Sequence, residues 1–305
     1  MVLKKMKNNH QSPQVIEELR PGQSIELLKE LHILTREGKL NQDTRRKLKQ
    51  VYHLYQFIEP LLESTVKLNA AFTLADHGAG KSYLGFILYD LFFNVAHAGD
   101  VGQSTAGHIY GIETRSELVD KSRALAARLR FERMSFLNLS VEQSATSKDL
   151  PDHIDIVTAL HACDTATDDA ISFGLAKRAQ HMVLVPCCQA EVAGVLKANR
   201  AFSLGKTPLA ELWRHPLHAR EFGSQITIVL RCLRLEASGY NVTVTELVGW
   251  EHSMKNELIL ASKPAAANLA KTSAAQQRLQ QVLAELGLGG QGLVELQQRF
   301  AANQY

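Results

Sequence analysis

The chain has 305 residues, of which 45% are hydrophobic and 21% are charged, and its net charge is +3 at pH 7. This composition is ordinary for a globular protein, and so small a charge does not by itself indicate a nucleic-acid partner. No apolar run approaches the ~18 residues of a membrane span, and the N-terminus lacks the apolar stretch of a signal peptide. Four cysteines, two of them adjacent, do not resemble a disulfide framework. We therefore expect a cytoplasmic protein that contacts no membrane.

The first part of the chain is expected to be helical. Residues 1–22 are polar without a period and predict a flexible N-terminus. Residues 23–68 carry two helical patterns, and the second begins after Asn41 with a basic cluster at 45–49. The first 50 residues hold eleven Lys or Arg against six Asp or Glu. This local excess favours a solvated face over an anionic partner, but it leaves RNA open.

Residues 69–263 alternate between short apolar runs and helical patterns. Strands are expected near 70–75, 109–112, 135–139, 154–160 and 182–185, with helices at 80–93, 167–179 and 222–236. Thr114 and Glu117 fit a capping box that opens a further helix. Such alternation predicts a parallel α/β sheet, whereas two late strands at 242–248 and 257–261 predict an antiparallel pair at one edge. Residues 264–305 predict a helical tail.

The turn that follows the first strand fits two nucleotide motifs. As a P-loop, its backbone N–H groups would surround phosphates and Lys81 would reach the terminal ones, although Ala75 stands where the strict pattern has glycine. Asp76 would then lie inside a loop that gathers anionic phosphate, which is unfavourable. A P-loop nucleotide-binding protein is therefore the weaker alternative.

As an Asp-x-Gly-x-Gly turn, the same residues suit a cationic cofactor. Gly78 and Gly80 let the backbone turn sharply and approach a ligand, while Asp76 offers a carboxylate to an ammonium group. Glu113 ends the next strand, where an acid binds ribose hydroxyls. These features favour S-adenosylmethionine as the cofactor.

The chain resembles the class I S-adenosylmethionine-dependent methyltransferases. The resemblance covers about residues 45–263 and is carried by Asp-x-Gly-x-Gly-Lys at 76–81, Leu-His-Ala-Cys-Asp at 160–164, Pro-Cys-Cys-Gln at 186–189 and the segment 251–256. It implies a Rossmann-like, seven-stranded, mostly parallel sheet whose last strand is antiparallel. It also implies methyl transfer. The expected cofactor-binding residues are Asp76, His77, Gly78, Ala79, Gly80, Lys81, Glu113 and Leu160.

The reacting site is expected where the fourth and fifth strands end, because ligands of open α/β sheets lie beyond the carboxyl ends of the strands. Asp164 and His161 are the candidate bases, and Cys163, Cys187 and Cys188 are expected to shape the pocket. A metal site and a covalent cysteine relay are less favoured, because the spacing is not that of a zinc motif. Asp168 and Asp169 are expected to cap the next helix.

The sequence thus predicts a methyltransferase whose acceptor is not fixed. RNA is favoured over a protein or a small molecule because of the basic helix start at 45–49, although no RNA-binding module accompanies it. A non-catalytic protein that binds S-adenosylmethionine and serves as a scaffold is a further alternative. The sequence does not predict an oligomeric state.

Overall fold

A seven-stranded sheet forms the centre of the molecule, in the order β3-β2-β1-β4-β5-β7-β6. The computed structural model describes residues 18–69, 71–96, 106–162, 164–186, 189–198, 206–247, 257–288 and 293–301. The strands are β1 (Ala71–His77), β2 (Ala106–Glu113), β3 (Met134–Asn138), β4 (Ile156–Ala162), β5 (His181–Pro186), β6 (Asn241–Glu246) and β7 (Glu257–Ser262). β1 to β5 pair in parallel, whereas β7 is antiparallel to both β5 and β6. The predicted fold class is confirmed.

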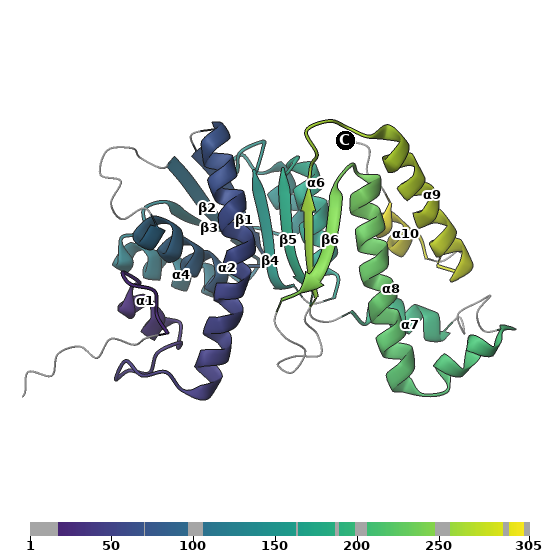
Figure 1. The fold of residues 1–305 in the computed structure, drawn as a ribbon, viewed down its shortest axis with the longest axis horizontal. Coiled ribbons are helices and arrows are strands. Elements are labelled where there is room, and N and C mark those ends of the chain that lie inside the picture. Colours follow the sequence, from purple (N-terminus) through teal and green to yellow (C-terminus); the bar gives the residue numbers. More distant parts are fainter. Residues whose placement is uncertain are drawn as a thin grey trace, which may run out of the picture.

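Helices cover the sheet, and the last helices of the chain lie together to one side of it (Figure 1). They are α1 (Ile25–Glu30), α2 (Gln42–Asn69), α3 (Tyr83–Tyr89), α4 (Ser116–Leu129), α5 (Val141–Thr146), α6 (Ala166–Ala176), α7 (Glu191–Ala198), α8 (Pro216–Ala237), α9 (Leu269–Glu285) and α10 (Val294–Phe300). A π-helical turn, η1 (Asp90–Ala96), continues α3, and a 3-10 helix, η3 (Pro208–Trp213), precedes α8.

Alternate residues of the strands feed two hydrophobic cores, one on each face of the sheet. Leu74 on β1 and Ile156 on β4 pack with α2, α3 and α4. Ala75 and Val157, their neighbours in the chain, belong to the other core with α6 and α8. Because successive strand residues point to opposite faces, apolar runs of this kind are buried on both sides. A third cluster joins α7, α8, α9 and α10, so the helical tail packs against α8.

The long helix α2 lies along the sheet and reaches past its carboxyl edge. It ends at Asn69, and β1 starts at Ala71, so the chain reverses direction there. A helix of 28 residues is about 42 Å long, whereas a strand of 7 residues spans about 23 Å. The basic first turns of α2 therefore lie beyond the ends of the strands, on the side where ligands of such sheets bind (Figure 1).

Two local predictions differ from the structure. The helix expected at 80–93 is split, because the carboxylate of buried Asp90 accepts the Ser24 N–H at 3.0 Å and Asn94 at 2.9 Å, and the chain continues as η1. The capping box expected at Thr114 is wrong, since the N-cap of α4 is Arg115 without a side-chain cap. A capping box forms at Ser140 and Gln143 instead. Among the described residues, no helix is long and apolar enough to cross a membrane.

Candidate functional site

The turn after β1 is held by its own backbone and by β2. Gly78, Gly80 and Ser82 all have positive φ, at 67°, 58° and 52°. The N–H of Ala79 donates to the carbonyl of Ile112 at 3.0 Å, and that of Ser82 donates to Ala79 at 2.7 Å. A Cβ added at Gly78 would meet no atom within 4 Å. The turn therefore leaves open space beside Gly78, where a ligand can approach the backbone closely.

The backbone donors of this turn are unsuited to a P-loop. A P-loop needs several free N–H groups that converge on phosphate. Here those of Ala79 and Ser82 bond to backbone carbonyls, and that of Gly80 donates to the carboxylate of Glu113 at 2.8 Å. A carboxylate already sits where a phosphate would be expected, and this arrangement argues against the P-loop alternative.

Glu113, the last residue of β2, is an ionised acid at the carboxyl ends of β1 and β2. We call this place the β1–β2 edge. Besides Gly80, its carboxylate accepts the backbone N–H of Arg115 at 3.1 Å and the Arg115 guanidinium at 3.0 and 3.2 Å. Burial alone would raise the pKa of Glu113, but these hydrogen bonds outweigh it and lower the pKa to about 2. Glu113 is therefore ionised at any physiological pH. The Arg115 side chain that covers it is 59% exposed and is free to move away.

Asp76 is buried at the base of the same turn. It is 2% exposed, and one of its oxygens accepts the hydroxyl of Thr158 on β4 at 2.9 Å. Burial raises the pKa of Asp76 to about 7, although Thr158 and the N–H of Gly85 oppose the shift. Its carboxylate thus ties β1 to β4 and to the start of α3. Direct contact with an ammonium group stays a prediction.

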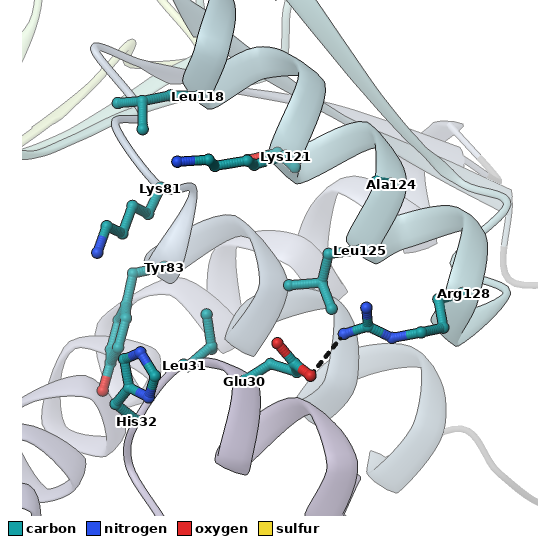
Figure 2. A pocket seen from close by; sticks show the side chains of 11 residues that line it. Glu30, Leu31, His32, Lys81, Tyr83, Leu118, Lys121, Ala124, Leu125 and Arg128 are labelled. Carbon is teal, nitrogen blue, oxygen red and sulfur yellow. Dashed lines mark ion pairs between the residues drawn. The ribbon is translucent and has the colours of Figure 1, made fainter.

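His77 and Leu160 lie at the ends of β1 and β4, and Lys81 lies outside the strands. The ring of His77 packs against Phe173 of α6 at 5.2 Å, and burial lowers its pKa to about 4. Neither of its ring nitrogens has a hydrogen-bond partner in the described part of the chain. Leu160 is half-buried at the end of β4. The Lys81 side chain is exposed and lines a separate pocket between α1 and α4 (Figure 2).

Asp164 follows β4 in a strained backbone conformation, with φ of 49°. Its Oδ1 accepts the N–H groups of Ala190 and Glu191 at 3.1 and 3.3 Å, so it caps α7 and links the end of β4 to the segment after β5. Gln189, in that segment, is buried and is hydrogen-bonded to Ser224 of α8. The structure therefore brings the two predicted reacting segments together. Cys163, Cys187, Cys188 and the His161 side chain lie outside the described residues, and their roles stay predictions.

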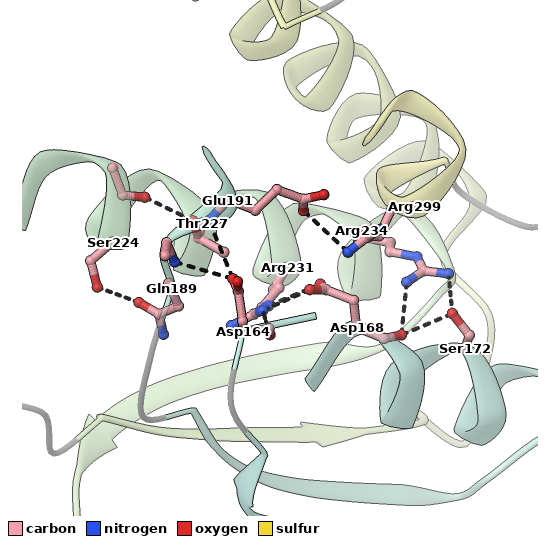
Figure 3. A network of polar contacts seen from close by, with 12 residues as sticks. Asp164, Asp168, Ser172, Gln189, Glu191, Ser224, Thr227, Arg231, Arg234 and Arg299 are labelled. Carbon is pink, nitrogen blue, oxygen red and sulfur yellow. Dashed lines mark hydrogen bonds and ion pairs between the residues drawn. The ribbon is translucent and has the colours of Figure 1, made fainter. Parts of the chain in front are cut away.

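The predicted cap at Asp168 is wrong, because this side chain forms a buried ion pair. Arg231 of α8 donates two hydrogen bonds to the Asp168 carboxylate, of 2.9 and 2.6 Å. The Arg231 and Asp168 side chains are only 1% and 2% exposed. The same guanidinium donates to the backbone carbonyl of Asp164 at 2.7 Å. Arg231 thus holds the end of β4 through its main chain (Figure 3).

The helical tail joins this network. Arg234, one turn after Arg231, donates to Ser172 of α6 at 3.0 Å and to the carbonyl of Ala301, just after α10, at 3.3 Å. Arg299 of α10 pairs with Glu191 of α7 at 3.1 Å. Figure 3 shows these side chains meeting between α6, α7, α8 and the tail. The tail therefore supports the elements that carry the β4 and β5 ends.

Comparison with known proteins identifies the core of the fold. Residues 46–195 match a family model described as a methyltransferase domain. This part of the chain is therefore similar to a methyltransferase domain. It includes the turn after β1, Glu113, and the segments after β4 and β5. A search of curated proteins by sequence finds no match.

Solved methyltransferases share the fold at low identity. The magnesium protoporphyrin IX methyltransferase of Synechocystis PCC 6803, with bound SAH, is 13% identical over 78% of this chain and 93% of its own, with a TM-score of 0.42. An rRNA methylase from Streptococcus thermophilus is 8% identical over 63% and 87%, with a TM-score of 0.38. The fibrillarin pre-rRNA processing protein of Methanococcus jannaschii is 11% identical over 63% and 66%, with a TM-score of 0.39. At these values nothing about cofactor or acceptor carries over to this chain.

Three arginines of the domain and its tail were missed by the sequence analysis. The sequence pattern gives Arg115 no role, although it directly follows the capping pattern's Thr114. Arg231 and Arg234 lie on the face of α8 that also buries Ile228 and Leu235. Charged residues at buried positions of an apolar stripe are seldom found without a partner, and that was the available signal.

Proposed function

We propose that the protein transfers the methyl group of S-adenosylmethionine to an acceptor, with RNA as the favoured acceptor. The proposal is carried by one observation: a part of the chain similar to a methyltransferase domain, in which the Gly78–Gly80 turn and the ionised Glu113 lie side by side at the ends of β1 and β2. Glycines at the first turn and an acid at the end of the next strand are what a nucleoside cofactor requires of such a sheet.

The residues of the β1–β2 edge fit this cofactor. The open space beside Gly78 admits a ligand against the backbone. Glu113 is an ionised acceptor for ribose hydroxyls, and the exposed guanidinium of Arg115, which now occupies its lone pairs, is the group that a ribose would replace. When bound, S-adenosylmethionine supplies an electrophilic methyl group on a cationic sulfur.

The carboxyl ends of β4 and β5, which we call the β4–β5 edge, are proposed to bind the acceptor and take up its proton. Among the described residues, the N–H groups that donate to the Asp164 carboxylate all contact Oδ1, which leaves Oδ2 to accept a proton from the acceptor. The cap on α7 and the bond from Arg231 to its main chain fix the position of this carboxylate, and such positioning favours displacement at the methyl carbon. His161 and the three cysteines remain proposed members of the same site.

RNA is favoured because of the basic start of α2, which lies beyond the strand ends. Arg45 pairs with Glu18 at 2.9 Å and Lys47 with Asp43 at 2.9 Å, so half of the cluster is locally neutralised. Arg46 and Lys49 are exposed and form no ion pair within the described ranges. They are the cations of this cluster that a phosphate chain would meet.

The test is methyl transfer from radiolabelled S-adenosylmethionine to cell lysate, followed by separation of RNA, protein and small molecules. We expect label in RNA, and Asp164→Asn should reduce it at least tenfold because the amide cannot take up the proton. Glu117→Gln, an exposed change on α4, should have no effect. Label in another fraction would overturn the RNA assignment. Cofactor binding without any transfer would identify a scaffold, and absence of cofactor binding would overturn the whole proposal.

A further inference from the structure

A pocket lies next to the glycine turn, between α1, the start of α3 and α4 (Figure 2). Its volume is about 390 Å³. This is within the size range of small-ligand sites and suits a single nucleotide. Lys81, the last residue of the turn, lines the pocket together with Lys121, Tyr83 and His32. The pocket is therefore next to the proposed cofactor turn but separate from it.

The charges that face this pocket are mainly positive. Its one lining acid, Glu30, is already paired with Arg128 at 2.7 Å, and Arg128 also contacts Glu26 at 3.2 Å. Lys81 and Lys121 form no ion pair with any residue that the structure describes. Figure 2 shows both lysines on the same side of the pocket, with the Glu30–Arg128 pair on the other. Two uncompensated ammonium groups suit an anionic ligand.

One polar group in the pocket wall lacks a partner. Tyr83 lines the pocket, and its hydroxyl is buried without a hydrogen-bond partner in the described part of the chain. A buried hydroxyl without a partner is unfavourable, so such a group is a candidate for a ligand contact. His32 stands beside Tyr83, held in the turn after α1 with φ of 54°, a conformation that favours glycine.

The rest of the wall is apolar. Leu31, Leu118 and Leu125 line the pocket with Ala124, and the rings of Tyr83 and His32 lie side by side at one end (Figure 2). A flat aromatic ligand packs well against aliphatic side chains and aromatic rings. The pocket thus offers an apolar and aromatic surface next to two cations, which is the combination that a base and its phosphate require.

We propose that this pocket binds a nucleotide, with its phosphate at Lys81 and Lys121 and its base against the leucines, Tyr83 and His32. The proposal deepens the proposed function, because a nucleotide of the acceptor RNA bound here would lie beside the glycine turn. A free nucleotide has the same chemistry, and the experiment separates the two sources.

The test is fluorescence anisotropy with a labelled single-stranded RNA of about 20 nucleotides and, in parallel, titration with AMP. Lys121→Ala should weaken RNA binding about fivefold and reduce the slope of log K against log salt by roughly 0.7, the value for one lost phosphate contact. Tyr83→Phe should also weaken binding without lowering the melting temperature, because the hydroxyl it removes has no hydrogen-bond partner among the residues that the structure describes. Lys67→Ala is the matched control, since Lys67 is exposed near the end of α2 at the opposite edge of the sheet.

The two possible sources give different outcomes. If the pocket serves RNA, AMP binds weakly or not at all while RNA binding responds to both substitutions. If it serves a free nucleotide, AMP binding responds as well. RNA and AMP binding that neither substitution changes, or no binding of either by the wild-type protein, would overturn the pocket assignment. SAH titration of the same proteins keeps the proposals apart: the wild type and Lys121→Ala should bind SAH equally, and no binding by the wild type would contradict the proposed function instead.

Discussion

The two edges at which the proposed site forms are built in different ways. At the β1–β2 edge, Glu113 is the last residue of β2, and it bonds to Gly80 and Arg115, which lie in the turns after β1 and β2. At the β4–β5 edge, Asp164 and Asp168 depend on Arg231, which is more than sixty residues away in the chain. The first edge is therefore organised by contacts between two neighbouring strand ends, and the second by contacts with α8 and the tail.

The arginines of the two edges also differ in exposure. Arg115 covers Glu113 from solvent and its side chain is 59% exposed, so a ligand can replace it at little cost. Arg231 is buried and bonds to Asp164 and Asp168, which both follow β4, so the segment after β4 is held in place. The exposed arginine suits the proposed cofactor site, which must exchange its ligand, and the buried arginine suits the proposed acceptor site, which needs fixed geometry.

The largest effect is expected when the β4–β5 edge is broken at Arg231→Ala. Asp168 would be left as an uncompensated buried charge, and unfolding free energy should fall by about 3–5 kcal/mol. Chemical denaturation measures this loss. Arg278→Ala is the control, because its pair with Glu236 is largely exposed and should contribute at most about 1 kcal/mol. A loss at Arg231 no larger than at Arg278 would contradict the importance of the buried pair.

Asp76 and His77 should produce opposite pH dependences of stability. Burial raises the pKa of Asp76 from 3.8 to about 7, so the folded state holds a proton that the unfolded chain has lost, and stability falls as pH rises from 4 to 7. Burial lowers the pKa of His77 from 6.5 to about 4, so the unfolded chain holds the extra proton and stability rises with pH from 4 to 6.5. The two contributions largely cancel in the wild type.

Replacing either residue should leave only the pH dependence of stability that the other residue produces. Relative to the wild type, Asp76→Asn should gain about 4 kcal/mol between pH 4 and 7, because the amide carries no charge to bury. His77→Phe should gain about 3 kcal/mol as pH falls from 6.5 to 4. Denaturation curves at several pH values measure both, and parallel pH profiles for the two variants and the wild type would contradict this account.

A smaller effect is expected where the tail supports the site. Arg299→Ala removes the partly buried pair with Glu191, and unfolding free energy should fall by about 1 kcal/mol. Because Glu191 opens α7, which Asp164 caps, methyl transfer should fall more than stability suggests. Arg214→Ala, which removes an exposed pair with Glu211, should change neither quantity. If Arg299→Ala leaves methyl transfer unchanged, the tail contributes to packing but does not support the site.

The sequence predicted the parts of the molecule that local patterns determine. Asp76 and Glu113 were placed at strand ends because each follows an apolar run, and the edge pair β6–β7 was predicted because no helix separates its two strands. The role of Asp168 was missed because its partner, Arg231, lies far away in sequence. Thr114 was misread as a cap because its hydroxyl bonds to Glu113 instead. A short sequence pattern does not show which other residue will bind a side chain in the folded protein.

If the β1–β2 edge binds the cofactor and the β4–β5 edge binds the acceptor, substitutions at the two edges should affect SAH binding differently. SAH titration of two variants tests this most directly. Glu113→Gln removes the ionised acceptor at the β1–β2 edge and should weaken SAH binding at least tenfold, the loss expected for hydrogen bonds to a charged group. Asp164→Asn keeps an oxygen for the α7 cap and should bind SAH within about twofold of the wild type. Equal losses in both variants, or normal binding by Glu113→Gln, would contradict the account.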